Sequence, residues 1–156
     1  MDLTTIGVKL GYATATANGT KPTAFTWLKR CKSIGAIDLS TDSIDVTALE
    51  DLIKQYADGV QDTGGKVDVT FGVSNDTEKS LSTYITAGQS AKTAGKEFWH
   101  VVWFPALTKS FYFKATPGTK LGMPEIGVGN AAEFKLSLVL NEYVGLDTAI
   151  EPTAGE

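Results

Sequence analysis

This sequence has little of the chemistry on which most enzymes depend. Its 156 residues include one cysteine and one histidine. A single cysteine excludes an intramolecular disulfide framework. A single histidine has no evident companion as a metal ligand or a catalytic base. Metalloenzyme and catalytic-triad chemistry is therefore disfavoured, and we expect no enzymatic activity, no metal and no cofactor.

The two isolated residues have simpler interpretations. Cys31 lies between Arg30 and Lys32, whose charges could lower a thiol pKa, but a catalytic cysteine would also need a base. We expect a half-buried strand cysteine. His100 lies within the most apolar segment of the chain, where we expect a core residue with a satisfied ring nitrogen. The glycines form no phosphate-binding motif and indicate turns.

Long hydrophobic runs are also missing. No segment approaches the roughly 18 apolar residues of a transmembrane helix, and residues 1–6 lack the basic and apolar regions of a signal peptide. We therefore expect a protein without a membrane anchor that is made and kept in a cytoplasm until it assembles. The length predicts a single domain over 1–156, with flexible ends at about 1–23 and 145–156.

The charge of the chain is acidic overall and unevenly distributed. A net charge of −4 argues against the usual basic surface of a nucleic-acid-binding protein. Residues 21–32 carry four basic side chains and no acidic one, whereas residues 38–68 carry eight acidic side chains and two lysines. Two interpretations are open. The segments are solvated faces that pair within one subunit, which we favour because such pairs are common and weak, or they form a head-to-tail contact between subunits.

Most of the regular pattern is that of β-strands. Apolar residues alternate with polar ones over Lys66–Val73 and Glu133–Asn141, which predicts strands with one dry and one wet face. Phe98–Phe104 is apolar on both faces and should be a central strand covered on both sides. Ser110–Lys114 should return beside it, and Trp27–Ile34 supplies another strand.

One segment has the pattern of a helix. Asn75 and Glu78 have the spacing of a capping box, with Gly88 and Gly95 as possible helix ends. A narrow apolar stripe recurs at helical spacing at Leu81, Tyr84 and Ile85. Such a helix must dock on a sheet to be stable. The expected fold class is thus mainly β, a β-sandwich or barrel-like fold with one flanking α-helix and long loops.

The most informative stretch is a long polar segment between strands. Strand-like residues at Ile34–Leu39 and Ser43–Thr47 precede an acidic segment from Ala48 to Gly65, and Lys66–Val73 follows it. Loops longer than about 12–15 residues are usually functional or disordered. We expect this segment to be mobile in an isolated subunit and to bind a partner, since it has little apolar surface with which to offset the entropy of ordering.

The same stretch carries three short motifs in a suggestive order. They are Ile-Asp-Val-Thr at 44–47, Gly-x-x-Asp-x-Gly at 59–64 and Val-x-Val-x-Phe at 67–71. In this order and spacing the chain resembles the major tail tube proteins of long-tailed bacteriophages. The resemblance extends from about Trp27 to Asn141 in strand order and loop placement.

That resemblance implies a structural virion protein. Members of the family form hexameric rings, which stack into a hollow phage tail tube through which DNA is ejected. The tube protein of the type VI secretion system shares the fold, so a type VI secretion-like tube protein is an alternative function. The implied partners are other copies of the chain, the tail tape-measure protein, and tail-tip or terminator proteins. DNA would pass through the lumen without specific binding, and the implied location is the tail of the virion.

Two groups of residues follow as candidates. The subunit or ring interface would use the acidic segment and the basic cluster that precedes it: Leu49, Glu50, Asp51, Leu52, Tyr56, Asp58, Asp62, Lys29, Arg30 and Lys32. The lumen would use the wet faces of two strands: Lys66, Asp68, Thr70, Glu133, Lys135 and Ser137. A wall that neutralised phosphates would retain DNA through counterion release, so the lumen should be acidic or neutral.

Other classes of function remain open at this point. A soluble carbohydrate-binding β-sandwich could use exposed Trp27, Trp99 and Trp103, although their strand context favours core positions. Carboxylates at Asp38, Asp42 and Asp45 could hold calcium, but their spacing is not that of an EF-hand and a solvated turn is favoured. A lectin should stay small and bind sugar, whereas a tube protein should form rings or filaments.

Overall fold

The computed structural model describes residues 6–62 and 64–154; of Val60, Asp62 and Ala154 it describes the backbone alone. Ten strands and one helix follow one another in these residues. In chain order they are β1 (Lys9–Thr14), β2 (Thr26–Leu28), β3 (Cys31–Ile34), β4 (Ser40–Asp45), β5 (Tyr56–Asp62), β6 (Lys66–Gly72), α1 (Asn75–Thr93), β7 (Phe98–Trp103), β8 (Lys109–Thr116), β9 (Glu133–Thr148) and β10 (Thr153–Ala154).

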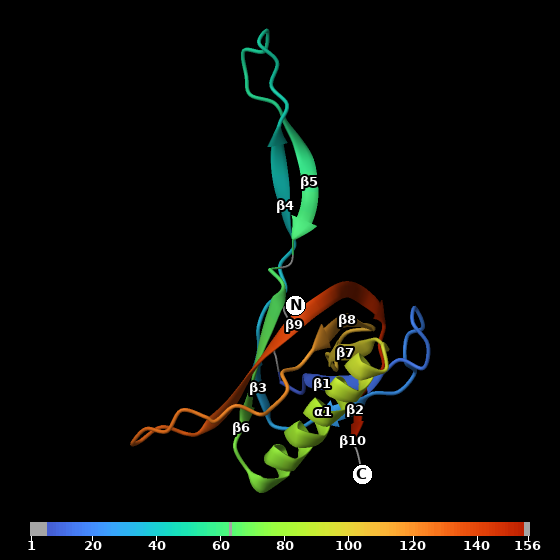
Figure 1. Ribbon diagram of the computed structural model, residues 1–156, viewed down its shortest axis with the longest axis vertical. Helices are drawn as coiled ribbons and strands as arrows, with labels where there is room; N and C mark the ends of the chain where they lie inside the picture. The colour runs from blue at the N-terminus through green and yellow to red at the C-terminus, as the bar shows by residue number, and fades with distance from the viewer. Residues whose placement is uncertain (1–5, 63, 155–156) are drawn as a thin grey trace.

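Eight of the strands form one sheet, in the order β10-β2-β1-β7-β8-β9-β6-β3. All neighbours are antiparallel except the short pair β10 and β2. The remaining strands, β4 and β5, pair only with each other and form a ribbon that projects from the body (Figure 1). The expected mainly-β fold with one flanking helix is confirmed.

The main core lies between this sheet and α1, which packs on β1, β7 and β8 (Figure 1). Strand β7 is the centre of the packing. Its Phe98 joins the core under the helix, whereas Trp99 and Val101 pack on the opposite face in a second buried cluster with Phe25 and Tyr112. The prediction of a strand covered on both sides is therefore confirmed for Phe98–Val101. Val102 and Trp103 are half-buried, and the strand ends before Phe104.

The ends of α1 follow local chemistry, with one correction. The N-cap is Ser74, not Asn75, because the Ser74 hydroxyl accepts a hydrogen bond of 3.1 Å from the Thr77 amide. Of the two expected ends, Gly95 is the one used, with φ at 70° just beyond the C-cap. Gly88 lies inside the helix on its buried face, where an added Cβ would lie 2.4 Å from Cγ of Pro117.

The expected single strand over Trp27–Ile34 is wrong. Two strands lie there, and Lys29-Arg30 separates them in a turn where Arg30 has φ at 64°. β2 pairs with β1, whereas β3 pairs with β6 at the other end of the sheet order. The alternation of side chains continues across this turn, and a two-residue turn changes such a pattern too little to be predicted from it.

The regions expected to be flexible ends also contain strands. Within 1–23, β1 occupies an interior position of the sheet between β2 and β7. Within 145–156, β9 continues to Thr148 and β10 adds a parallel partner to β2. Glycine, threonine and alanine give these segments weak strand patterns, and their pairing partners lie far away in the chain.

Candidate functional site

The acidic segment singled out in the sequence is the outer part of a long projecting hairpin, which we call the arm, residues 38–62 (Figure 1). This corrects the expected loop over Ala48–Gly65, because β5 falls within it, and it also corrects the expected strand at Ile34–Leu39, which ends at Ile34. Ser43 pairs with Asp58 and Asp45 with Tyr56 in the ribbon. The strand-like residues expected at Ser43–Thr47 overlap β4, whereas β5 was missed, because a ribbon exposed on both faces needs no apolar alternation.

The end of the arm, residues 46–55, presents apolar side chains to solvent. Leu49 and Leu52 are fully exposed, and Ile53 is 75% exposed. The turns beneath them have hydrogen bonds of their own: the Asp51 carboxylate accepts from the Ala48 amide at 2.8 Å and the Thr47 hydroxyl from the Gln55 amide at 2.8 Å. Monomeric proteins rarely leave such apolar groups together in water without a partner.

The basic candidates lie on the body of the molecule, at the turn between β2 and β3. Lys32 forms an ion pair with Glu133 at 3.3 Å, and the Lys29 ammonium lies 5.5 Å from the centre of the Trp27 ring. The described ion pairs include none between this turn and the arm. Arm and basic turn are thus separate surfaces of one chain.

All six lumen candidates lie on one face of the β6–β9 pair. The register places Asp68 opposite Ser137 and Thr70 opposite Lys135. Lys66 and Glu133 occupy the two ends of the same face. The intervening residues point the other way, and the ones on β6, Val67, Val69 and Phe71, are buried. The exposed face therefore combines two lysines and two carboxylates with hydroxyl groups.

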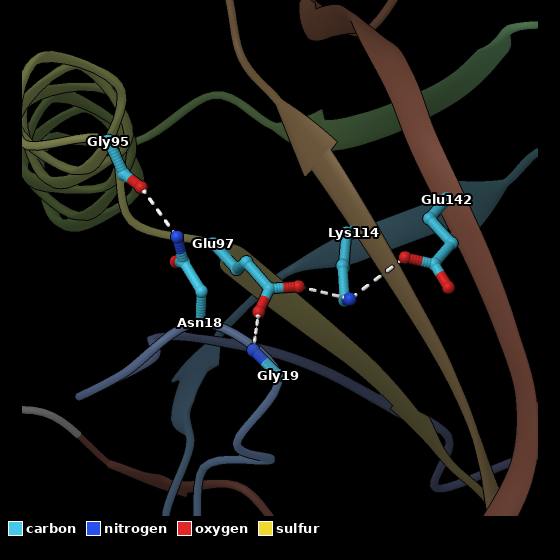
Figure 2. Close-up of polar contacts among 6 residues, drawn as sticks. All are labelled: Asn18, Gly19, Gly95, Glu97, Lys114 and Glu142. Atoms are coloured by element: carbon cyan, nitrogen blue, oxygen red, sulfur yellow. Dashed lines mark hydrogen bonds and ion pairs between the residues drawn. The ribbon is translucent and has the colours of Figure 1, made fainter.

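Sequence reasoning missed a charged cluster on the body of the molecule (Figure 2). Lys114 on β8 lies between Glu97 and Glu142, and its ammonium is 2.8 Å from the Glu142 carboxylate. Glu97 also accepts a hydrogen bond from the Gly19 amide. The side chains of Lys114 and Glu97 are only 14% and 19% exposed. The members of the cluster lie far apart in the sequence, so no local sequence pattern indicates that they meet.

The electrostatics of the cluster favour its charged state. Hydrogen bonds from Lys114 and from the Gly19 amide lower the pKa of Glu97. Burial alone would lower the pKa of Lys114, but its hydrogen bonds to Glu142 and Glu97 outweigh burial and raise the pKa. With Asn18, which donates to the Gly95 carbonyl at 3.2 Å, the cluster ties residues 18–19 to the strands and to the end of α1 (Figure 2).

The chemically versatile residues occupy structural positions. His100 is fully buried, and its Nε2 lies 2.6 Å from the Tyr84 hydroxyl, which confirms a core residue with a satisfied nitrogen. Cys31 is a half-buried strand residue as expected, and burial raises the pKa of its thiol to about 11, which opposes the activation considered from its neighbours Arg30 and Lys32.

The tryptophans follow the expectation only in part. Trp99 is buried, but Trp27 and Trp103 are half-buried, and the Lys9 ammonium lies 4.6 Å and 5.3 Å from their ring centres. In the described part of the chain no three His, Cys, Asp or Glu side chains gather to hold a metal ion. No helix among the described residues combines the length and apolar character needed to cross a membrane.

Comparison with known proteins gives a likeness of fold. No family model and no curated protein matches the chain. Among solved structures, a chain from the tail of an empty GTA particle with C6 symmetry is similar over 90% of this chain and 96% of its own length, with a TM-score of 0.51 and 12% identity. A chain from the 6-fold symmetrised baseplate of the anti-feeding prophage (AFP) is similar over 96% of this chain and 97% of its own length, with a TM-score of 0.48 and 10% identity.

Proposed function

We propose that this chain is a structural tail protein that assembles head to tail into six-membered rings, which stack into the hollow tube of a phage tail. The observation that carries the proposal is the arm: a paired ribbon whose end exposes Leu49, Leu52 and Ile53, which no other described residue covers. The likeness of fold to a chain from a C6-symmetric tail supports the ring number.

Two different surfaces of one chain make this contact heterologous. Acidic residues of the arm, including Glu50, Asp51 and Asp58, would face the basic turn at Lys29, Arg30 and Lys32 of the next copy. A heterologous contact that closes gives a ring, and one that does not close gives a filament. In a tube of stacked rings, the contacts within each ring close, whereas the contacts between rings continue along the tube.

The exposed face of β6 and β9 would line the lumen. Its lysines are balanced by Asp68 and Glu133, so it offers DNA no continuous row of cations. Such a wall releases few counterions from DNA and lets it slide. The other partners that we propose are the tail tape-measure protein and tail-tip or terminator proteins.

Imaging and sizing of the purified chain over a wide range of concentrations test the proposal. We expect rings or tubes at high concentration, and tubes at lower concentration when tail-tip proteins are supplied as initiators. A chain that stays monomeric under all these conditions would show that the proposed function is wrong.

A second experiment tests the role of the arm. Replacing residues 40–62 with a short Gly/Ser turn should leave a cooperative thermal unfolding transition, because the ribbon pairs only with itself, and should abolish tube formation. The milder Leu49→Ser/Leu52→Ser variant should weaken assembly in the same direction. Val128→Ser is the matched control, since Val128 is equally exposed but lies in the loop between β8 and β9. Normal polymerisation of the shortened chain would contradict this role.

A further inference from the structure

An apolar groove of about 510 Å³ opens at the root of the arm. It lies between the segment that continues β3 and the end of the β7–β8 hairpin. Its apolar lining includes Ile34, Ile37, Val102, Phe104, Phe111 and Tyr143. All six are only partly buried, so these side chains are accessible from solvent in the single chain.

We propose that this groove receives the end of the arm, residues 46–55, of a second copy of the chain. This inference rests on the proposed function and names the receiving surface. Both surfaces are apolar, and among the described residues neither is covered: Leu49, Leu52 and Ile53 on the arm, and the aromatic and branched side chains in the groove. Joining them removes two apolar surfaces from water in a single contact.

The arm of the same chain does not reach this groove. Gly35, Ala36 and Ile37, which lead into the arm, line the groove themselves. The paired strands β4 and β5 then carry residues 46–55 away from the body (Figure 1). Six residues of strand span about 20 Å, so the end of the arm is held far from its own root. The contact has to join two copies.

Charge at the two surfaces is complementary. The end of the arm carries Glu50 and Asp51 beside its leucines. Lys32 lines the groove, and its ammonium also pairs with Glu133 at 3.3 Å. The Arg30 side chain does not line the groove but lies near Lys32, since both approach Gly72: an added Cβ on Gly72 would lie 3.4 Å from Cε of Lys32 and 3.6 Å from Nη2 of Arg30. Opposite charges at the rim of an apolar contact set its orientation more than its strength.

The position of the groove explains how such a contact would propagate. Each copy would offer one arm and, at the root of that arm, one groove for the next. A docked arm therefore leaves the arm of the receiving copy free to bind a further copy, which is the property of a head-to-tail contact.

Disulfide cross-linking in the assembled protein tests the contact. In a Cys31→Ser background, Leu52→Cys and Ile37→Cys place one thiol on the arm and one in the groove. We expect oxidation of the assembled variant to give a ladder of covalent oligomers on a denaturing gel. The control pair Leu52→Cys and Thr83→Cys, with Thr83 exposed on α1, should give no ladder.

Two further variants measure the contact by assembly. Ile37→Glu should raise the concentration needed for assembly by about tenfold or more, since it puts a charge in an apolar contact, with the thermal transition checked for folding. Arg30→Glu should raise it roughly two- to fivefold, and adding Asp51→Arg should restore it. If the chain assembles but forms no ladder of covalent oligomers, and Ile37→Glu has no effect, the groove does not receive the arm, while the proposed function still stands. Failure of the unaltered chain to assemble would instead contradict the proposed function.

Discussion

At the scale of single residues, the molecule uses its versatile side chains for packing. His100 lies flat against Phe113, with ring centres 4.9 Å apart, and accepts or donates one hydrogen bond with Tyr84 across the sheet–helix interface. Burial lowers the pKa of His100 to about 3. The ring is therefore neutral at physiological pH and serves to hold α1 on the sheet.

Removing the Tyr84 hydroxyl should destabilise the fold. Tyr84→Phe leaves the buried Nε2 of His100 without its partner, so we expect the free energy of unfolding to fall by about 1–3 kcal/mol. Thermal or denaturant unfolding measures this. Tyr56→Phe is the control, because Tyr56 is 58% exposed on the arm. Equal stability of the two variants would show that the buried hydrogen bond contributes nothing.

The stability of the chain should fall as the pH falls below about 6.5. The folded state keeps His100 neutral down to about pH 3, whereas the unfolded chain takes up its proton near pH 6.5. The unfolded state thus binds more protons between these values, and the free energy of unfolding should fall by up to about 1.4 kcal/mol per pH unit. His100→Gln should flatten the slope between pH 6.5 and 5, measured by denaturant titration. An unchanged slope in this variant would contradict the assignment.

At the scale of elements, close backbone packing positions the helix. Gly88 on α1 approaches Pro117, which follows β8. A Cβ added to Gly88 would also lie 3.2 Å from the ring of Phe98 on β7. Gln89 donates hydrogen bonds to the Pro117 carbonyl at 3.0 Å and the Gly118 carbonyl at 3.2 Å. The C-terminal half of α1 is therefore bonded to the start of the long β8–β9 loop.

Gly88→Ala should destabilise the protein even though alanine favours helices. An alanine Cβ would overlap Pro117 and force the helix to move, at a cost of roughly 1–3 kcal/mol, which exceeds the propensity gain of about 1 kcal/mol. For a domain of this size, the expected loss lowers the melting temperature by about 2–4 °C per kcal/mol. Gly122→Ala is the control, because nothing lies within 4 Å of its added Cβ. A Gly88→Ala variant more stable than the parent would contradict the close approach.

At the scale of the whole molecule, the body and the arm have different tasks. The body has a buried core on both faces of β7 and an internal charge cluster around Lys114. The arm has almost no buried side chains, and its large apolar groups are exposed. In our proposal, the body folds by itself and the arm completes its contacts only in the assembly.

Chemical labelling of the assembled tube should identify the lumen. In a Cys31→Ser background, Ser137→Cys lies on the exposed face of β9 and Thr83→Cys on the exposed face of α1. We expect a small maleimide to label both positions in tubes, and a maleimide on a bulky polymer to label only Thr83→Cys. In the dissociated chain both reagents should label both. Rapid polymer labelling of Ser137→Cys in intact tubes would place the β6–β9 face outside the lumen.

The sequence by itself determined the elements that repeat a local pattern. Alternation along β6 and β9, the two-sided apolar run of β7 and the stripe on α1 each arise from neighbouring residues that must share a buried face. The same reasoning correctly placed His100 and Cys31 in structural positions. It also grouped all six lumen candidates, since one face of two paired strands follows from period two.

Only the tertiary structure decided which distant segments meet. β1 lies inside the sheet although its own pattern is weak, because its partners β2 and β7 supply the hydrogen bonds. Lys114 and Glu142 come from β8 and β9, and Glu97 directly precedes β7. The groove joins β3 to the β7–β8 hairpin. The arm strands β4 and β5 are exposed on both faces and form their backbone pairing only with each other. Contacts of this kind depend on pairing across long stretches of chain, which local periodicity does not encode.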